Sequence, residues 1–217
     1  MNNIDLVYVL KLLPGIILGL TVHEFMHAKV ACWLGDTTAR DQGRVTLNPI
    51  KHIDLWGFVF IIFAGFGWAK PVQINREALK NPRRGEMLIA VAGPLSNLVM
   101  GILCAAIIKL IVTFFPVTEN QIYSVIVSLL LYAVFINYGL FIFNILPVPP
   151  LDGSHLIFNA LKIREETERK IFKYGIVVLF AIIIIENQTN LHILPLGKVI
   201  TFMAENSFRW MGIHFDM

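Results

Sequence analysis

The chain has 217 residues, of which 56% are hydrophobic and 15% are charged, and its formal net charge is +3 at pH 7. Soluble domains usually carry about 25% charged residues, so this composition excludes an ordinary soluble globular protein and predicts a polytopic membrane protein. The small net charge gives no indication of nucleic-acid binding. The first residues lack a basic region and a small-residue cleavage site, so we expect the first apolar segment to stay in place.

Apolar segments alternate with polar connections in the first third of the chain. Residues 4–22 form an apolar stretch that is long enough to enter a membrane as a helix. In the polar connection that follows, residues 43–49 alternate between polar and apolar side chains, which predicts a short strand. Residues 55–69 are apolar but short and rich in glycine, so a re-entrant segment is as well indicated as a full span.

Two longer apolar stretches follow a basic polar loop at residues 71–85. Residues 87–115 and 122–146 are each long enough to span a bilayer, and the second ends at a cluster of prolines. Residues 153–161 are expected to form a short helix, while 174–185 and 191–204 are weaker candidates for spans. The pattern predicts an all-α polytopic membrane protein, a bundle of about four to six membrane helices with short re-entrant or β segments.

The chain shows no internal repeat and no second soluble domain. We therefore expect residues 1–217 to form one membrane-embedded domain. Its core, at about residues 4–160, carries the motifs described below, and further helices follow at about 170–217.

An HExxH motif lies at the end of the first apolar segment. On a helix, His23 and His27 are four residues apart and project from one face, where they can share a zinc ion. Glu24 follows His23 directly, where its carboxylate can take a proton from zinc-bound water. Ionisable residues are costly inside a membrane, which favours a functional role for all three.

The lysine and arginine residues predict how the chain is oriented in the membrane. Residues 70–84 and 162–173 each carry five lysine or arginine residues, whereas the connections at 116–121 and 187–191 carry none. Basic loops stay on the cytoplasmic side. Both basic loops are therefore expected on that side, in a multi-pass protein of the cell membrane. The HExxH motif and the end of the 122–146 span are then close to the cytoplasmic face.

A catalytic zinc ion usually has three protein ligands and keeps one position for water. HExxH supplies two, and Asp152 follows a span that ends on the same side of the membrane as His23 and His27. Asp152 is therefore the best-placed third ligand. His155 competes with it, and His52 competes less well.

Five sequence pieces together resemble the site-2 protease family of intramembrane zinc metalloproteases. They are HExxH (23–27), GRVTLNPIKHID (43–54), GWAKPV (67–72), AGPLSN (92–97) and NILPVPPLDG (144–153), in the order of that family. The resemblance is to compact members, because no PDZ-like or CBS-like domain is present.

This resemblance implies a zinc metalloendopeptidase that takes part in regulated intramembrane proteolysis. It implies one Zn²⁺ per chain, held by His23, His27 and Asp152, with Glu24 as the catalytic base. The implied partners are a transmembrane protein substrate and the lipid bilayer. The family leaves the oligomeric state and the regulation of this chain open.

Two asparagines are candidates for holding the oxyanion or positioning the substrate. Asn97 and Asn144 lie in the AGPLSN and NILPVPPLDG pieces, although asparagines in membrane helices also bond to neighbouring helices. Substrate capture is predicted at strand edges formed by residues 43–49 and 71–75, with a purely structural hairpin as the equal alternative.

The rival function is a membrane zinc-binding protein or metal transporter without hydrolytic activity. Transporters commonly carry ionisable residues in several spans. Here the spans after the first contain few such residues, Lys109 being the clearest, which argues against an ion path.

Overall fold

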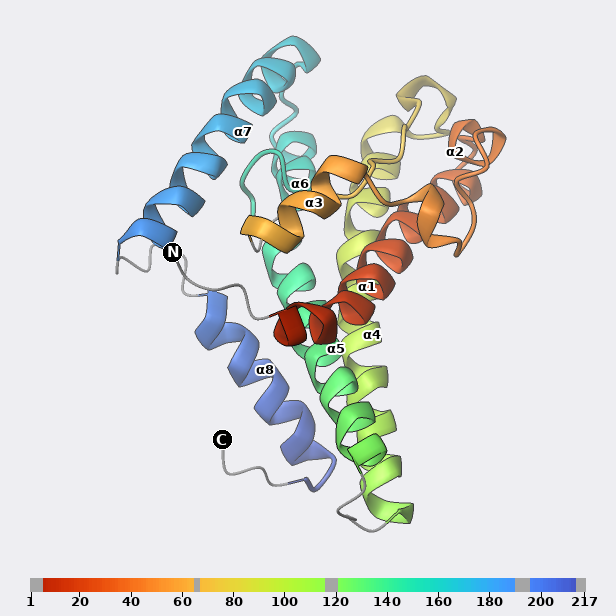
Figure 1. Cartoon of the computed structure of the whole chain (residues 1–217). Coiled ribbons are helices and arrows are strands. Elements are labelled where there is room, and N and C mark those ends of the chain that lie inside the picture. Colours follow the sequence, from red (N-terminus) through yellow and green to blue (C-terminus); the bar gives the residue numbers. More distant parts are fainter. Residues whose placement is uncertain (1–5, 65–66, 116–120, 190–195, 214–217) are drawn as a thin grey trace.

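Three long helices form the centre of the molecule (Figure 1). The computed structural model describes residues 6–64, 67–115, 121–189 and 196–213. The long helices are α1 (Leu6–Trp33), α4 (Pro82–Phe114) and α5 (Gln121–Ile145), and each is long and apolar enough to cross a membrane. The protein is thus an all-α polytopic membrane protein, as predicted, with three clear spans among the residues described.

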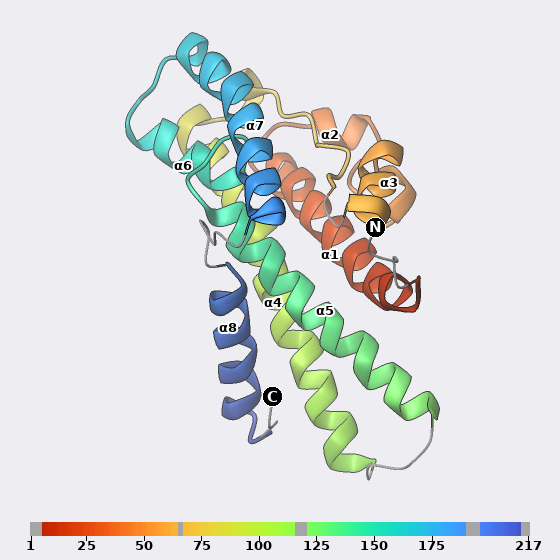
Figure 2. The ribbon, with the colours of Figure 1, turned by 60° about the vertical axis from the view of Figure 1, so that its left-hand side comes forward.

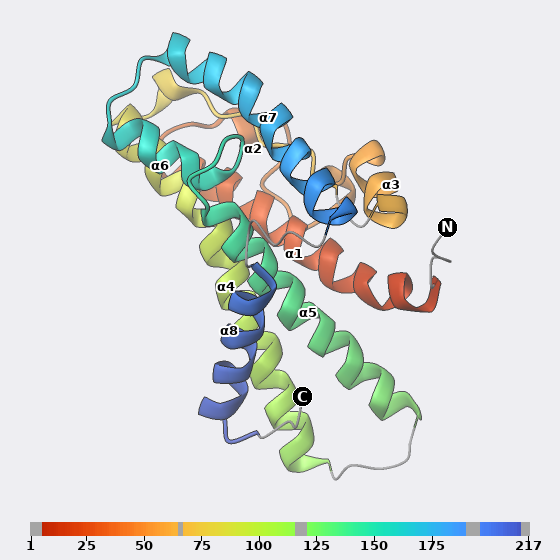
Figure 3. The same cartoon turned by 90° about the vertical axis from the view of Figure 1, so that its left-hand side faces the viewer.

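The helices α4 and α5 lie side by side along much of their length, and α8 (Leu196–Trp210) lies against them (Figure 3). Their shared core contains Cys104, Ile108, Val134, Tyr138 and Phe208, all buried. The Tyr138 hydroxyl is 2.6 Å from Ser207 Oγ, so the one polar group of this large side chain has a partner on α8. A Cβ on Gly101 would overlap the ring of Tyr138, so glycine lets α4 approach α5 closely here. Small residues play this part between membrane helices, which lack a hydrophobic driving force for association.

Helix α1 is longer than the predicted segment 4–22, because it continues as one helix through the HExxH motif to Trp33. Pro14 lies within it without ending it. Its contact with α5 depends on glycine: a Cβ on Gly19 would lie 2.7 Å from Leu140 and 3.1 Å from Asn137. Side chains of α5 therefore pack directly against the backbone of α1 just before His23.

The connection between α1 and α4 contains α2 (Thr38–Asp41), η1 (Pro49–Lys51), α3 (Leu55–Ala64) and η2 (Arg76–Ala78). Helix α3 stands beside α1 rather than inside the bundle (Figure 2). Of the apolar stretch predicted at residues 55–69, residues 55–64 form this short helix, and residues 65 and 66 lie outside the described part of the chain.

The strand predicted at residues 43–49 is not formed. Gly43 has a φ of +66°, and the Asn48 side chain accepts the Ile50 N–H and starts η1 at Pro49. These local hydrogen bonds bend the chain where a strand would extend it. In the part of the chain that the structure describes, the single β-type contact is an antiparallel bridge between Ile53 and Ala69.

Two further helices follow α5. Helix α6 (Asp152–Ala160) packs against α4, close to the prediction for 153–161. Helix α7 (Glu165–Gln188) includes most of the charged stretch at 162–173 that was expected to precede a span at 174–185, and it lies to one side of α4 and α5 (Figure 1). The candidate span at 191–204 falls partly outside the described residues, and α8 covers the rest of it.

Candidate metal centre and catalytic cleft

The metal centre is built where one face of α1 meets one face of α4. Gly19, His23 and His27 recur at intervals of four on α1, and the antiparallel α4 presents Ile89, Gly93 and Asn97 at the same interval. The two stripes face each other, so α4 contacts both histidine rings. A Cβ on Gly93 would lie 2.6 Å from Cε1 of His27 and 2.7 Å from Cε1 of His23. Only glycine leaves room for both rings at this position.

Hydrogen bonds fix both imidazole rings. His23 Nδ1 donates to Asn97 Oδ1 at 2.7 Å, and His27 Nδ1 donates to the Ile89 carbonyl at 2.7 Å. A histidine that donates from Nδ1 keeps the lone pair of Nε2 free for a metal. The two Nε2 atoms point to the same place and lie 3.0 Å apart.

Asp152 completes this group from the first turn of α6. Its Oδ2 lies 3.1 Å from Nε2 of His23 and 3.3 Å from Nε2 of His27. At these distances a carboxylate oxygen can share one divalent metal ion with the two Nε2 atoms.

These three atoms fit a zinc ion. A tetrahedral ion with bonds of about 2.0–2.1 Å separates its ligand atoms by about 3.3 Å, close to the three separations seen here. Among the residues that the structure describes, the buried Oδ2 of Asp152 accepts no hydrogen bond, which leaves it free as a ligand. Among the described residues, His23, His27 and Asp152 form a group of potential metal ligands whose ligand atoms all lie within 4.8 Å of one another.

Neither competing histidine belongs to this group of three ligand atoms. His155 Nδ1 is 3.5 Å from Glu168 Oε1, and its ring lies against Phe172. His52 is fully buried, and its Nε2 donates to the Thr46 carbonyl at 2.7 Å. Burial, together with the nearby Arg44, lowers the pKa of His52, so His52 is neutral at neutral pH.

Glu24 points into a cleft of about 380 Å³ that also reaches His27 and Asp152. Its Oε2 accepts the Val72 N–H at 3.1 Å, so the carboxylate is fixed by a backbone amide and not by the metal ligands. The cleft is further lined by Pro71, Val72, Glu86, Ile89, Pro150, His155 and Phe172, among others. The arrangement places a carboxylate beside the three ligands, within one cavity.

The two asparagines do not face this cleft. Asn97 is fully buried, and its Nδ2 donates to the Gly19 carbonyl and to Asn137 Oδ1, both at 3.0 Å. Both of its N–H groups and its carbonyl oxygen are thus engaged within the bundle. Asn144 Nδ2 donates to the Leu140 carbonyl of its own helix at 3.0 Å. Neither asparagine lines the cleft described above.

An extended segment at residues 67–75 forms one wall of the cleft. The Lys70 N–H donates to the His52 carbonyl at 2.8 Å, and the Arg44 guanidinium donates to the Lys70 carbonyl at 2.5 Å. The Asn75 N–H donates to the buried Asp36 at 2.7 Å. Distant polar side chains therefore hold this segment along α1. No sequence pattern indicated these partners, because Asp36 and Arg44 lie in separate turns.

Arg76 joins three parts of the chain beside the cleft. Its guanidinium pairs with Glu86 of α4, and with Glu165 at 3.0 Å and Glu168 at 3.5 Å, both on α7. Burial lowers the pKa of Arg76, but these carboxylates outweigh it and raise the pKa. The basic character of 70–84 predicted a loop at the membrane surface and not this ion-pair cluster.

Comparison with known proteins places the chain among metalloproteases. It matches the family described as Peptidase family M50 over residues 11–125 and 111–185. It is 36% identical to a Bacillus subtilis protein with the provisional name zinc metalloprotease YwhC, over 94% of this chain and 91% of the relative. It is 30% identical to the similarly named Rip2 of Mycobacterium tuberculosis, over 72% of this chain and 59% of the relative. No solved structure matches the chain.

Proposed function

We propose that this chain, which belongs to peptidase family M50 and is a zinc metalloprotease of the membrane, hydrolyses peptide bonds of membrane-spanning proteins. One observation supports the proposal most: three ligand atoms and a separate carboxylate meet in one cleft, beside a helix long enough to span the membrane. A peptide bond can therefore reach the site only where His23, Glu24 and His27 lie within α1.

We assign His23, His27 and Asp152 as the ligands of one zinc ion. Zinc bound there would acidify a water molecule and polarise the carbonyl of the scissile bond. His23 and His27 supply neutral nitrogens, because Asn97 and the Ile89 carbonyl hold their Nδ1 protons. Asp152 adds a negatively charged oxygen to these two neutral nitrogens, and such a set of three ligands suits a divalent zinc ion.

We assign Glu24 as the general base. Its carboxylate takes the proton of the attacking water and later gives it to the departing amine. The Val72 N–H keeps one carboxylate oxygen in place, which leaves the other oxygen for the proton. Asn97 we assign to the orientation of His23 rather than to contact with substrate, because all of its polar atoms are engaged.

A transmembrane helix must unwind before it can be cut, because its peptide groups are bonded to one another. The extended segment at residues 67–75 offers a backbone against which an unwound substrate can lie. It replaces residues 43–49 as the candidate for strand capture. The HExxH end of α1 lies on the cytoplasmic side in this proposal, because both basic loops are at that end.

The proposal is tested by comparing Glu24→Gln with His23→Ala. The full chain in liposomes is assayed for zinc content, and membrane fractions of cells that carry each variant are compared by proteomics. Glu24→Gln should retain zinc and lose cleavage by roughly 10²–10⁴-fold or more, because only the base is removed. His23→Ala should lose zinc as well as cleavage. Wild-type cleavage by Glu24→Gln would exclude this mechanism, and loss of its zinc would make Glu24 a ligand.

A further inference from the structure

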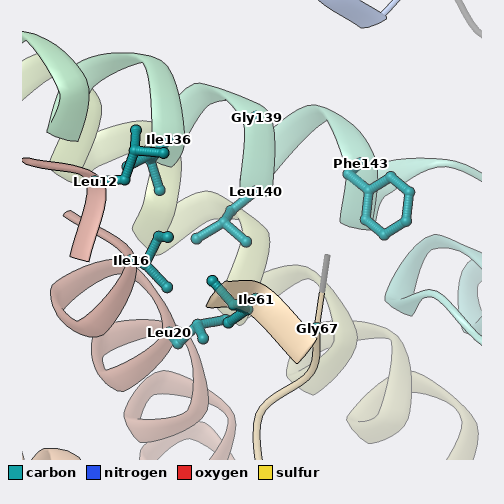
Figure 4. Close-up of a pocket in the computed structure, with 9 residues that line it drawn as sticks. All are labelled: Leu12, Ile16, Leu20, Ile61, Gly67, Ile136, Gly139, Leu140 and Phe143. Carbon is teal, nitrogen blue, oxygen red and sulfur yellow. The ribbon is translucent and has the colours of Figure 1, made fainter. Parts of the chain in front are cut away.

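A second cavity lies next to the catalytic cleft, between α1, α3 and α5 (Figure 4). It encloses about 320 Å³ and contains no ionisable side chain in its lining. Apolar side chains from the three helices point toward one another around it (Figure 4). They include Leu12, Ile16 and Leu20 of α1, Ile61 of α3, and Ile136 and Leu140 of α5. We call this cavity the apolar groove.

The apolar groove leads to the catalytic base along α1. Leu12, Ile16, Leu20 and Glu24 follow one another at intervals of four and so lie on one face of the helix. Leu20 is one turn from Glu24, about 6 Å along the helix axis. The extended segment borders both cavities, since Gly67 lines the apolar groove while Pro71 and Val72 line the cleft.

Helix α3 forms one side of the apolar groove. It presents Ile61 to the groove, while Trp56 and Phe63 are 67% and 72% exposed on its other faces. The groove and the cleft are lined by neighbouring turns of α1 and by the same segment at residues 67–75, and the chain that enters the cleft is the substrate.

We propose that the apolar groove is a substrate subsite, which takes a large apolar side chain of the membrane-spanning substrate. An extended chain advances about 3.3 Å per residue, and Leu20 and Ile16 lie about 6 and 12 Å from Glu24 along α1. The side chain is therefore about two to four residues from the bond that is cut. This inference rests on the proposed function and adds a specificity to it.

Selection in this groove depends on shape. Lipid chains are as apolar as the groove, so moving an apolar side chain from the bilayer into the groove adds little binding free energy. The fit of the side chain therefore decides which residue is preferred. Pockets of this kind distinguish apolar side chains by roughly 10–200-fold. The absence of polar groups predicts that leucine or phenylalanine is accepted and that a small or charged residue is disfavoured.

Two tryptophan variants of α1 provide a matched test. Leu20→Trp fills the apolar groove, whereas Leu18→Trp makes the same change on the opposite side of the helix, where Leu18 is 41% exposed. The probe is a set of synthetic membrane-spanning peptides, weakened at the centre by Asn-Gly. Each carries Ala, Leu or Phe at one position two to four residues from that centre, on either side. Mass spectrometry locates the cut, and kcat/KM is measured for each peptide.

The wild-type chain should cleave the Leu or Phe peptide about tenfold better than the Ala peptide at one of these positions. Leu20→Trp should bring that ratio close to one, and Leu18→Trp should preserve it. Ile16→Ala enlarges the groove and should shift the preference toward Phe. It also serves as the deciding variant if Leu20→Trp does not fold. Unchanged ratios in Leu20→Trp and Ile16→Ala, or no preference in the wild type, would overturn the subsite.

A separate measurement keeps the subsite distinct from the proteolytic mechanism. If wild type and Glu24→Gln both leave every peptide intact, the proposed function fails, and the groove is then tested by binding. A peptide with photoreactive leucine at the variable position is cross-linked to Glu24→Gln in liposomes. Adducts on Leu12, Ile16, Leu20 or Ile61 support the subsite. Adducts on the Leu18 side, or occupation of the groove by a photoreactive phospholipid that the peptide does not displace, overturn it.

Discussion

Asn97 controls one ligand of the metal centre without touching the cleft. Its carbonyl oxygen accepts the Nδ1 proton of His23, while its amide group is held by Gly19 and Asn137. Asn97→Leu removes the acceptor and leaves a buried N–H of His23 without a partner, so His23 loses its preferred tautomer and orientation. Loss of such a partner typically weakens metal binding by about 10–100-fold. We expect this decrease for Asn97→Leu, measured by competition with a zinc chelator.

Asn144→Leu is the matched control, because the Asn144 amide bonds only to its own helix at Leu140 in the contacts described above. This variant should leave zinc affinity unchanged. Equal zinc affinity in Asn97→Leu and the wild type would contradict the positioning role of Asn97. A role in substrate contact would then again be open for both asparagines.

Gly93 is required because α4 approaches the two histidine rings. An added Cβ would overlap the rings of His23 and His27, and neither ring can move without breaking its Nδ1 hydrogen bond. Gly93→Ala should therefore lower zinc affinity by at least tenfold. Gly197→Ala is a useful control, because its Cβ meets nothing within 4 Å. Full zinc affinity in Gly93→Ala would show that the helices can separate locally.

The candidate metal ligands could be predicted from the sequence better than the residues that position those ligands. The HExxH spacing is enough to place His23 and His27 on one face, and the membrane orientation drew attention to Asp152, which the structure places beside both. Asn97 was noticed, but a sequence does not show which way an amide points once α4 packs on α1. Gly93 belonged to the AGPLSN piece, yet its proximity to the rings depends on the helix register.

At the scale of the elements, the turn at residues 43–54 depends on a neutral histidine. His52 is buried, donates from Nε2 to Thr46, and has no partner for Nδ1 among the described residues. Its pKa lies below the ordinary 6.5, so the unfolded turn binds a proton more readily than the folded one. The stability of this turn is therefore present above pH 6.5, and it decreases as the pH falls from 6.5 toward the lower pKa of the folded state.

Hydrogen exchange at pH 5 and pH 7.5 can measure this effect, after correction for intrinsic exchange rates. Amides in residues 43–54 should be less protected at pH 5 in the wild type. His52→Gln keeps an N–H for the Thr46 carbonyl but does not titrate, so its protection should not depend on pH. The same pH dependence in both proteins would show that another group is responsible.

Helix α7 is held beside the cleft by Arg76. The guanidinium bridges α4 and the first turns of α7, and Phe172 of α7 lines the cleft. Arg76→Met keeps an apolar stem but removes these ion pairs, and it should increase hydrogen exchange in residues 165–172. Arg169→Met removes the exposed partner of Glu165 on α7 itself and should have little effect, since exposed pairs contribute little. Equal exchange in both variants would mean that packing alone holds α7.

The elements themselves were predicted to different extents. Long apolar runs gave α4 and α5 nearly as observed, because length and composition suffice for a membrane helix. Residues 43–49 alternate as a strand does, but Asn48 and Gly43 form turns there. The start of α7 was not predicted, because its charged residues are typical of a surface loop. In the structure, Glu165 and Glu168 instead pair with Arg76.

For the whole molecule, the structure constrains the topology before charge is considered. Arg76 and Glu165 lie in the two basic segments, 70–84 and 162–173, and are 3.0 Å apart, so both segments must be on one side of the membrane. The end of α4 and the start of α5 lie at the opposite end of the molecule (Figure 1). The lysine and arginine residues then predict that the side with the basic segments is cytoplasmic.

Cysteine labelling in intact cells tests this topology. Cys32 and Cys104 are first replaced by serine or alanine, and single cysteines are placed at Glu77, Glu166 or Gln121, all exposed. None of these changes removes a positive charge from the predicted cytoplasmic loops. A membrane-impermeant thiol reagent should label Gln121→Cys in intact cells, and Glu77→Cys and Glu166→Cys only after permeabilisation. External labelling of both basic segments would reverse the orientation, whereas labelling of one alone would contradict the Arg76–Glu165 contact and the position of α7 beside the cleft.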